Sequence, residues 1–177
     1  DAGELANTVR RVISLSDEYE ALLAAATPAP LGEGVVETDL AGLFYTGGTT
    51  GASKGVMLTH RNLIANALNW LASVPQNASD RSLVMAPMFH AAGSNGILAA
   101  MWQGALQVPL GIFDPAAVLD LIEQHHINMT LGVPSMLAAI AEEQHANPRD
   151  TSSLQVLTHG GSPIATEVVR RTISAFP

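Results

Sequence analysis

The segment Thr46-Gly-Gly-Thr-Thr-Gly-Ala-Ser-Lys-Gly55 combines four glycines, three threonines and one lysine within ten residues. Glycine has no Cβ atom, so successive backbone N–H groups of such a segment can approach one anion closely. The threonine hydroxyls add donors, and Lys54, the only lysine of the chain, adds a flexible positive charge. This composition predicts a phosphate-binding loop. Its candidate contact residues are Thr46, Gly47, Gly48, Thr49, Thr50, Gly51 and Lys54.

The same loop also fits a simple turn between two strands. One short apolar run ends at Tyr45 and another occupies residues 56–58, so a strand is expected on each side. The Walker pattern has Gly before its lysine and Ser or Thr after it, whereas Ser53 and Gly55 flank Lys54 here. The chain also contains no G-x-G-x-x-G segment. The residues therefore leave a plain hairpin turn and a phosphate-binding loop as alternatives.

Two further segments place polar or glycine residues where a predicted strand ends. His159-Gly160-Gly161-Ser162-Pro163 lies between a predicted strand and a predicted helix, so its main chain could approach a flat ligand near a helix N-terminus. His90 lies after another predicted strand, where it would face a ligand at the sheet edge. Each segment has a simpler interpretation. The glycine pair also fits a tight turn, and His90 also fits an ordinary capping or core histidine.

Four predicted strand–helix units would position these segments. The strands are expected at residues 82–86, 106–110, 128–133 and 154–158. The helices are expected at residues 91–103, from Asp114-Pro115, at 135–145 and from Ser162-Pro163. Such alternation predicts an α/β fold with a parallel sheet flanked by helices. Ligands bind beyond the carboxyl ends of parallel strands, so residues 88–90, 134–135 and 159–162 are expected at one edge.

The first part of the chain is predicted to contain the glycine-loop hairpin and a helix after it. Thr59 is expected to cap this helix and Pro75 to end it. Its apolar face would carry Leu63, Ile64, Ala67, Leu68 and Leu71. We also predict a strand at residues 9–15, a helix at 17–26 and a loop at 27–34.

Composition excludes several classes of function. The net charge of −8 argues against nucleic acid or an anionic membrane as a partner. The absence of cysteine excludes disulfides and thiolate metal sites. His125 and His126 are adjacent, so their side chains would point about 100° apart on a helix, and no metal site is predicted. With no apolar run near 18 residues and no signal-like N-terminus, we expect a cytoplasmic protein without a membrane span.

The glycine loop with the following Val56-Met-Leu-Thr-His-Arg-Asn62 resembles the AMP-binding signature of the adenylate-forming enzymes. These include acyl-CoA synthetases, aryl-CoA ligases, luciferases and peptide-synthetase adenylation domains. Gly47 and Ser53 replace the frequent Ser and Pro of that signature, and the Thr-Gly-Gly variant is similar to that of fatty-acyl-CoA synthetases, which favours aliphatic acids. Residues 159–163 resemble the family's Gly-Gly-Ala-Pro element, with Ser162 in place of Ala, and residues 85–93 resemble its Pro-x-x-His motif.

The resemblance implies an ATP-dependent, AMP-forming acid–thiol ligase. An acid and ATP would form an acyl-adenylate, which then acylates CoA or a carrier-protein thiol, with ATP, Mg²⁺ and CoA as cofactors. The loop would hold the phosphates, Gly160, Gly161 and Ser162 would pack against adenine, and His90 would lie near the acid. The family's Tyr-Gly-x-Thr-Glu motif, with its magnesium-linked Glu, is expected beyond Pro177. We therefore expect an inactive fragment, with residues 1–80 and 81–177 as parts of two α/β subdomains and no complete catalytic set.

Three interpretations remain open from the sequence. The first is a fragment of an AMP-forming acyl-CoA synthetase, which the three ordered motifs favour. The second is an aryl-CoA ligase or a thiolation-linked adenylation domain. The third is a phosphate-binding module without enzyme activity. Exposed edge strands of a truncated sheet could also pair with a second copy, so a homodimer is a further hypothesis.

Overall fold

The computed structural model describes residues 12–30, 34–47 and 53–176. The chain divides into two units, Asp1–Val35 and Val36–Pro177. In the first unit, helix α2 (Tyr19–Ala25) lies within the helix expected at residues 17–26. The strand expected at 9–15 is wrong for its described part, because residues 12–14 have no regular structure and residues 9–11 lie outside the description. Val12 and Leu15 are exposed there, since the described residues provide no strand beside them.

The predicted hairpin is present in the second unit. Strands β1 (Leu40–Thr46) and β2 (Lys54–Thr59) pair antiparallel, and Thr46 lies opposite Lys54 at the end of the ladder that the glycine loop closes. The register shifts between Leu40 and Gly42. Large apolar side chains of both strands are exposed, among them Tyr45 at 71% and Met57 at 69%. A two-stranded hairpin with so little buried surface contributes little stability alone.

Helix α3 (His60–Ser73) begins where the sequence predicts. Thr59 and Asn62 form a capping box, in which the Asn62 N–H donates to Thr59 Oγ1 (3.3 Å) and the Thr59 N–H donates to Asn62 Oδ1 (3.0 Å). The residues before β1 are held to the same helix end, because the Arg61 N–H donates to the Glu37 carbonyl oxygen at 2.8 Å. The capping box therefore sets the direction in which the chain leaves the hairpin.

The parallel sheet predicted for the rest of the chain is confirmed. Its strands are β3 (Arg81–Val84), β4 (Leu106–Pro109), β5 (Met129–Gly132) and β6 (Val156–His159). They alternate with helices α4 (Ala91–Gln103), α5 (Pro115–His125), α6 (Pro134–Ala146) and α7 (Thr166–Ala175). The spatial order is β4-β3-β5-β6, and all three pairs are parallel.

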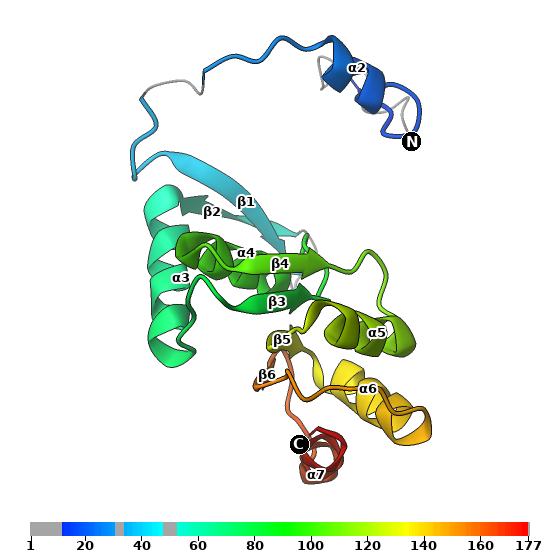
Figure 1. Ribbon diagram of the computed structural model, residues 1–177. Helices are drawn as coiled ribbons and strands as arrows, with labels where there is room; N and C mark the ends of the chain where they lie inside the picture. The colour runs from blue at the N-terminus through cyan, green and yellow to red at the C-terminus, as the bar shows by residue number, and fades with distance from the viewer. Residues whose placement is uncertain (1–11, 31–33, 48–52, 177) are drawn as a thin grey trace. The chain divides into compact units, whose positions relative to one another are not determined.

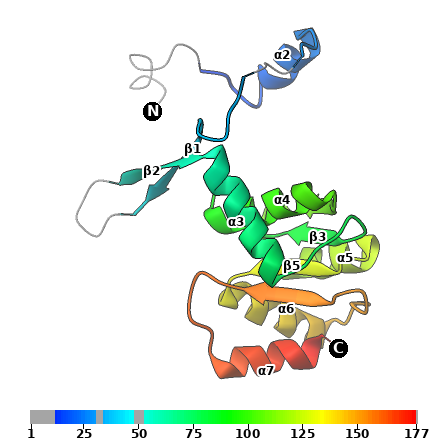
Figure 2. The same cartoon turned by 90° about the vertical axis from the view of Figure 1, so that its left-hand side faces the viewer.

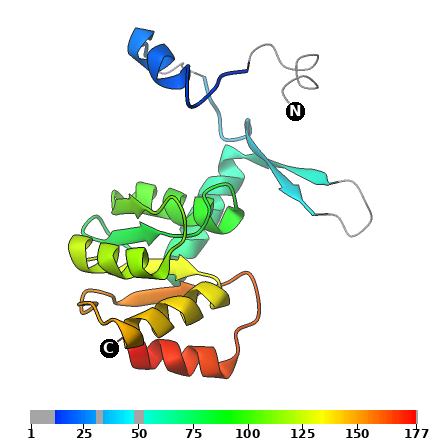
Figure 3. The same cartoon turned by 90° about the vertical axis from the view of Figure 1, so that its right-hand side faces the viewer.

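Helices cover both faces of this sheet. Figure 1 shows α3 and α4 on one side of the strands and α5 and α6 on the other. Figure 2 shows α3 crossing the face that α4 also covers, and Figure 3 shows α5, α6 and α7 side by side. The chain leaves β3 for one edge, returns past it to β5, and then continues to β6. This reversal places helices on both faces, because right-handed crossovers in opposite directions lie on opposite sides of a sheet.

The hydrophobic core fills the space between the sheet and helices α5 and α6. Its buried members include Leu83, Leu119, Ile122, Leu137 and Ile140. Asp114 caps α5 as predicted, because its carboxylate accepts the Ala117 N–H at 2.8 Å. One face of each of the helices α5 and α6 thus packs into the core.

Helix α7 begins later than predicted. Pro163 was expected at its first position, but the helix starts at Thr166, with Ala165 as the cap residue. A residue before proline is pushed toward extended backbone, which keeps Ser162 out of a helix. Ile164 is partly buried and packs against the core cluster, so the chain reaches the core before the helix starts.

Charged residues at the end of α6 join it to α5. The Arg149 guanidinium contacts Asp120 of α5 at 2.9 Å and Glu143 of α6 at 2.7 Å. The next residue is also held, because the Asp150 N–H donates to Glu123 Oε1 at 2.8 Å. These contacts fix the loop that leads into β6.

Asp150 is expected to make folding stability depend on pH in the acid range. Hydrogen bonds from the Ser152 hydroxyl and N–H hold the pKa of the Asp150 carboxyl below its ordinary value of 3.8. Because this pKa is lowered in the folded state, the ionised Asp150 carboxylate contributes its full stabilisation of the fold above about pH 3.8. This stabilisation is lost as the pH falls below that value. Asp150→Asn should therefore lower the urea midpoint more at about pH 6 than at about pH 2.5. An equal loss at both pH values would contradict this assignment.

Candidate functional site

The chain segments that follow β3, β5 and β6 meet at the carboxyl edge of the sheet. The Gly160 N–H donates to the Gly132 carbonyl oxygen at 3.3 Å, which joins the ends of β6 and β5. The Met85 side chain packs over Gly132, where an added Cβ would lie 2.6 Å from Met85 Cε. The structure thus brings together the three segments that the sequence places at one edge.

His90 is held at this edge as the N-cap of α4. Its ring Nδ1 accepts the Ala92 N–H at 3.2 Å, and the backbone N–H of His90 donates to the Pro87 carbonyl oxygen at 3.0 Å. An Nδ1 that accepts a hydrogen bond places the proton of the neutral ring on Nε2. The side chain is exposed, so Nε2–H is the donor left for a ligand. The capping interpretation is correct, and it leaves the other ring nitrogen available.

The first turn of α4 packs directly on the chain that leaves β3. A Cβ atom at Gly93 would lie 2.9 Å from the Ala86 carbonyl oxygen and would also contact the Pro87 carbonyl oxygen. Only glycine allows this close approach. It brings α4 and His90 close to the end of β3.

The glycine pair after β6 forms a bend rather than a helix start. Gly161 has φ +82°, a conformation that favours glycine, and a Cβ there would lie 3.5 Å from Val133 Cγ1 of the neighbouring loop. Ser162 is exposed, and residues 163–165 separate it from α7. The expected helix N-terminus beside Ser162 is therefore wrong, and any ligand at this point meets main chain and the Ser162 hydroxyl.

The glycine loop is described only at its two ends. The Thr46 hydroxyl donates to the Lys54 carbonyl oxygen at 3.4 Å, and both side chains are exposed. Gly47 is described and exposed, whereas Gly48, Thr49, Thr50 and Gly51 lie outside the described residues. Among the described residues, no hydrogen bond joins Thr46 or Lys54 to the segments at the sheet edge. The hairpin and the edge are therefore two separate parts of the candidate site.

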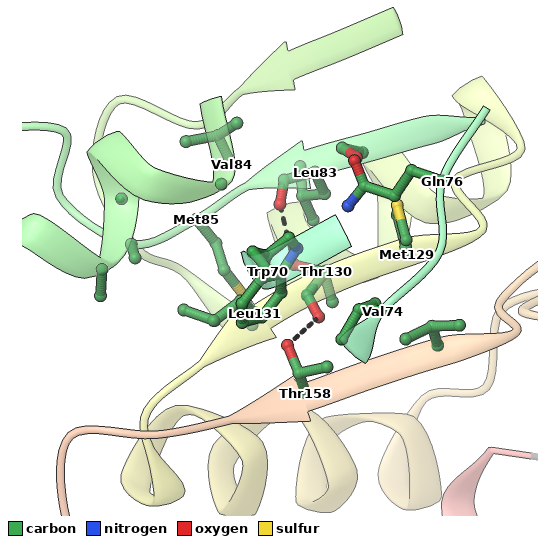
Figure 4. A pocket seen from close by; sticks show the side chains of 16 residues that line it. Trp70, Val74, Gln76, Leu83, Val84, Met85, Met129, Thr130, Leu131 and Thr158 are labelled. Carbon is green, nitrogen blue, oxygen red and sulfur yellow. Dashed lines mark hydrogen bonds between the residues drawn. The ribbon is translucent and has the colours of Figure 1, made fainter. Parts of the chain in front are cut away.

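A cavity of about 40 Å³ lies on the sheet face that α3 and α4 cover. Figure 4 shows its wall, which includes Trp70, Gln76, Met129 and Leu131. Both β3 and β5 line it, so it lies at the point where the strand order reverses. Ligands of open α/β sheets bind at such a reversal, beyond the strand ends.

Sequence reasoning missed this cavity and two of its polar residues, Trp70 and Gln76. Trp70 lies three residues after Ala67 on the buried side of α3, so helical spacing could have found it. Gln76 follows Pro75 in a connecting segment, where no periodicity marks it. A residue of that kind becomes part of a site only through the packing of distant segments.

The strand order and the repeated strand–helix units define a doubly wound α/β domain preceded by a glycine-loop hairpin. A model of the AMP-binding enzyme family matches residues 3–177, and the chain belongs to this family. The resemblance seen in the motifs is confirmed.

Two curated relatives illustrate the family. Feruloyl-CoA synthase of an Amycolatopsis species is 40% identical over 134 residues, which cover 75% of this chain and 27% of that protein. A medium/long-chain-fatty-acid–CoA ligase of Mycobacterium tuberculosis is 36% identical over 159 residues, covering 87% of this chain and 28% of the ligase. The chain thus spans less than a third of the length of these relatives.

Among solved structures, o-succinylbenzoate CoA synthetase of Bacillus subtilis in complex with AMP superposes with a TM-score of 0.84 at 26% identity. The match covers 99% of this chain and 35% of the synthetase. Within the described residues, no helix has the length and apolarity needed to cross a membrane.

Proposed function

We propose that this chain carries part of the active site of an AMP-forming ligase that joins a carboxylic acid to a thiol. In the reaction proposed for the whole protein, the acid carboxylate attacks the α-phosphorus of ATP and the bond to pyrophosphate breaks. The thiol of CoA then attacks the acyl-adenylate, and AMP leaves. Family membership supports this reaction, and so do the relatives that are CoA ligases.

The observation that carries the proposal is the pairing of Thr46 with Lys54 at the two ends of the glycine loop. Both side chains are exposed, and the sequence between them is rich in glycine and threonine. An ammonium group at this position would neutralise phosphate charge, and the hydroxyl would donate to a phosphate oxygen. The residues that are present therefore fit a triphosphate.

At the sheet edge, we assign Gly160, Gly161 and Ser162 to the adenine side and His90 to the acid. Gly161 is exposed and has no side chain, so a flat base could stack on its main chain. The free Nε2–H of His90 would donate to the acid carboxylate or to the adenylate. Neither role requires His90 to take up a proton.

Magnesium ligands are not assigned in this chain. In the described residues, no group of three or more His, Cys, Asp or Glu side chains converges. We therefore derive no step through Mg²⁺ from these residues, although ATP would be supplied as its magnesium complex.

Two classes of acid are candidates for this site. The Thr-Gly-Gly variant of the loop favours an aliphatic acid, whereas the feruloyl-CoA synthase is at least as similar to this chain as the fatty-acid ligase. An aryl-CoA ligase is therefore the second candidate. Acid-dependent pyrophosphate exchange by the full-length protein, with octanoate and with 4-hydroxycinnamate, would separate the two.

Calorimetric titration of this chain with MgATP tests the phosphate assignment. Lys54→Ala should weaken binding about tenfold or more, because a charge-assisted contact contributes about 1.5–3 kcal/mol. Arg170→Ala is the matched control, because it removes one exposed positive charge from α7. The Arg170 guanidinium makes a long, exposed contact with Glu167 at 3.6 Å. Equal affinity of the Lys54 variant and the control would contradict the assignment. Absence of MgATP binding to the unsubstituted chain would also contradict it.

A further inference from the structure

Two buried polar atoms of the described residues have no hydrogen-bond partner, and both belong to the wall of one cavity. They are Trp70 Nε1 and Gln76 Oε1. The indole N–H can only donate, and the amide oxygen can only accept. Gln76 is only 9% exposed, so solvent does not satisfy its oxygen. Burial of a polar group without a partner is unfavourable, and a ligand group that pairs with it would remove this cost.

The threonine hydroxyls of the cavity wall are already used within the sheet. Thr130 Oγ1 donates to the Leu83 carbonyl oxygen at 2.9 Å, and Thr158 Oγ1 donates to the Thr130 carbonyl oxygen at 3.3 Å. Figure 4 shows both bonds as dashed lines. The remaining wall is mostly apolar. The wall therefore keeps an unpaired buried donor on Trp70 and an unpaired buried acceptor on Gln76, beside the Ser82 hydroxyl.

The cavity extends along β3 from the beginning of the strand to its carboxyl end. Ser82 and Gln76 line it near the start of the strand, and Met85 lines it after the strand ends. On the opposite wall, Gly93 and Gly96 belong to the helix that His90 caps. A ligand whose carboxylate lies at His90 would therefore point its other end toward Trp70 and Gln76.

The cavity has room for the tip of a ligand. Its volume of about 40 Å³ compares with roughly 10–15 Å³ for one water molecule. A hydroxyl group with the carbon atoms next to it fits this space. A hydroxyl also donates and accepts at once, which matches the indole N–H and the amide oxygen.

We propose that Trp70 and Gln76 select an acid that carries a hydroxyl group at the end remote from its carboxylate. This inference rests on the proposed function, since it names the class of acid for that site. The hydroxyl oxygen accepts the Trp70 N–H, and its proton is donated to Gln76 Oε1. An acid with a methyl group at the same position leaves both protein atoms unpaired and binds more weakly.

Calorimetry with two matched ligand pairs tests this selection on the present chain. The aromatic pair is 3-(4-hydroxyphenyl)propanoate and 3-(4-methylphenyl)propanoate, and the aliphatic pair is 8-hydroxyoctanoate and nonanoate. We expect the hydroxylated member to bind about tenfold more tightly in at least one pair. That pair also identifies the carbon skeleton, aromatic or aliphatic.

Gln76→Met removes the acceptor with little change in side-chain volume. The preference for the hydroxyl should fall to about threefold or less, and the methyl ligand should bind more tightly than before. The variant should keep its fold, because the main-chain carbonyl of Gln76 still accepts the Gln103 side chain at 2.8 Å. Gln107→Met is the matched control: Gln107 lies on β4 and donates to the Ile97 carbonyl oxygen, away from the cavity wall, so the preference should persist.

Each remaining outcome separates this inference from the function on which it rests. Equal binding of both members in both pairs would mean that water alone pairs Trp70 and Gln76, which overturns the inference and leaves the ligase proposal standing. 4-Methylphenol carries the hydroxyl group without a carboxylate. If it binds as tightly as the hydroxylated aromatic acid, the result would support hydroxyl selection and contradict the acid site. Absence of binding by all ligands would overturn the inference, while the MgATP titration judges the ligase proposal independently.

Discussion

Leu119→Ala is expected to lower the free energy of unfolding by about 2–5 kcal/mol. Leu119 lies on α5, its side chain is fully buried, and it belongs to the cluster between the sheet and α5 and α6. Truncation removes apolar contacts and leaves a cavity that the close-packed surroundings fill only in part. A loss of this size is a large fraction of the stability of an ordinary domain.

Urea denaturation followed by far-ultraviolet circular dichroism measures this loss. Ile112→Ala is the matched control, because Ile112 is 85% exposed in the loop before α5. The control should change stability by less than about 0.5 kcal/mol. A loss below about 1 kcal/mol for Leu119→Ala would show that the α5 face is not the centre of the core.

Gly93→Ala is expected to destabilise the protein by about 1–3 kcal/mol and to disturb the sheet edge at the same time. The added methyl group would meet the Ala86 and Pro87 carbonyl oxygens, which are main-chain atoms and cannot rotate away. Relief of this contact requires α4 to move from the end of β3. Because His90 caps α4, the imidazole would move with it.

Gly96→Ala is the matched control in the same helix. A Cβ at Gly96 meets no atom within 4 Å, so this substitution should stabilise α4 by about 0.5–1 kcal/mol through its helix propensity. The two variants should therefore shift the urea midpoint in opposite directions. A midpoint that rises in both would mean that the turn at residues 86–90 adapts freely, which would contradict the close approach assigned to Gly93.

Local sequence signals predicted most of the elements because each depends on residues that are near one another in the chain. Thr59, and Asp114 with Pro115, mark helix starts that the structure reproduces. Four alternating units also predicted a parallel sheet, since a strand–helix–strand path leads to that arrangement. The family followed from the ordered glycine loop and the two later motifs. The division into subdomains at residue 80 and the individual ligand contacts remain predictions.

Two errors came from competition between local preference and tertiary contacts. The apolar alternation at residues 9–15 suggested a strand, but a strand is stable only beside a partner. Pro163 suggested a helix start, but Ile164 is drawn toward the core and α7 begins after it. In both places the deciding interaction lies outside the local segment.

Local chemistry determines the motifs, the helix caps and the strand–helix alternation, so the sequence alone predicts them. The sequence alone does not predict the strand order β4-β3-β5-β6, because this order depends on which strands pair across long separations. That order joins the ends of β3, β5 and β6 at one edge and creates the cavity beside them. Trp70 and Gln76 acquire their place in its wall through this packing, since burial of a polar atom without a partner is a property of the folded surroundings alone.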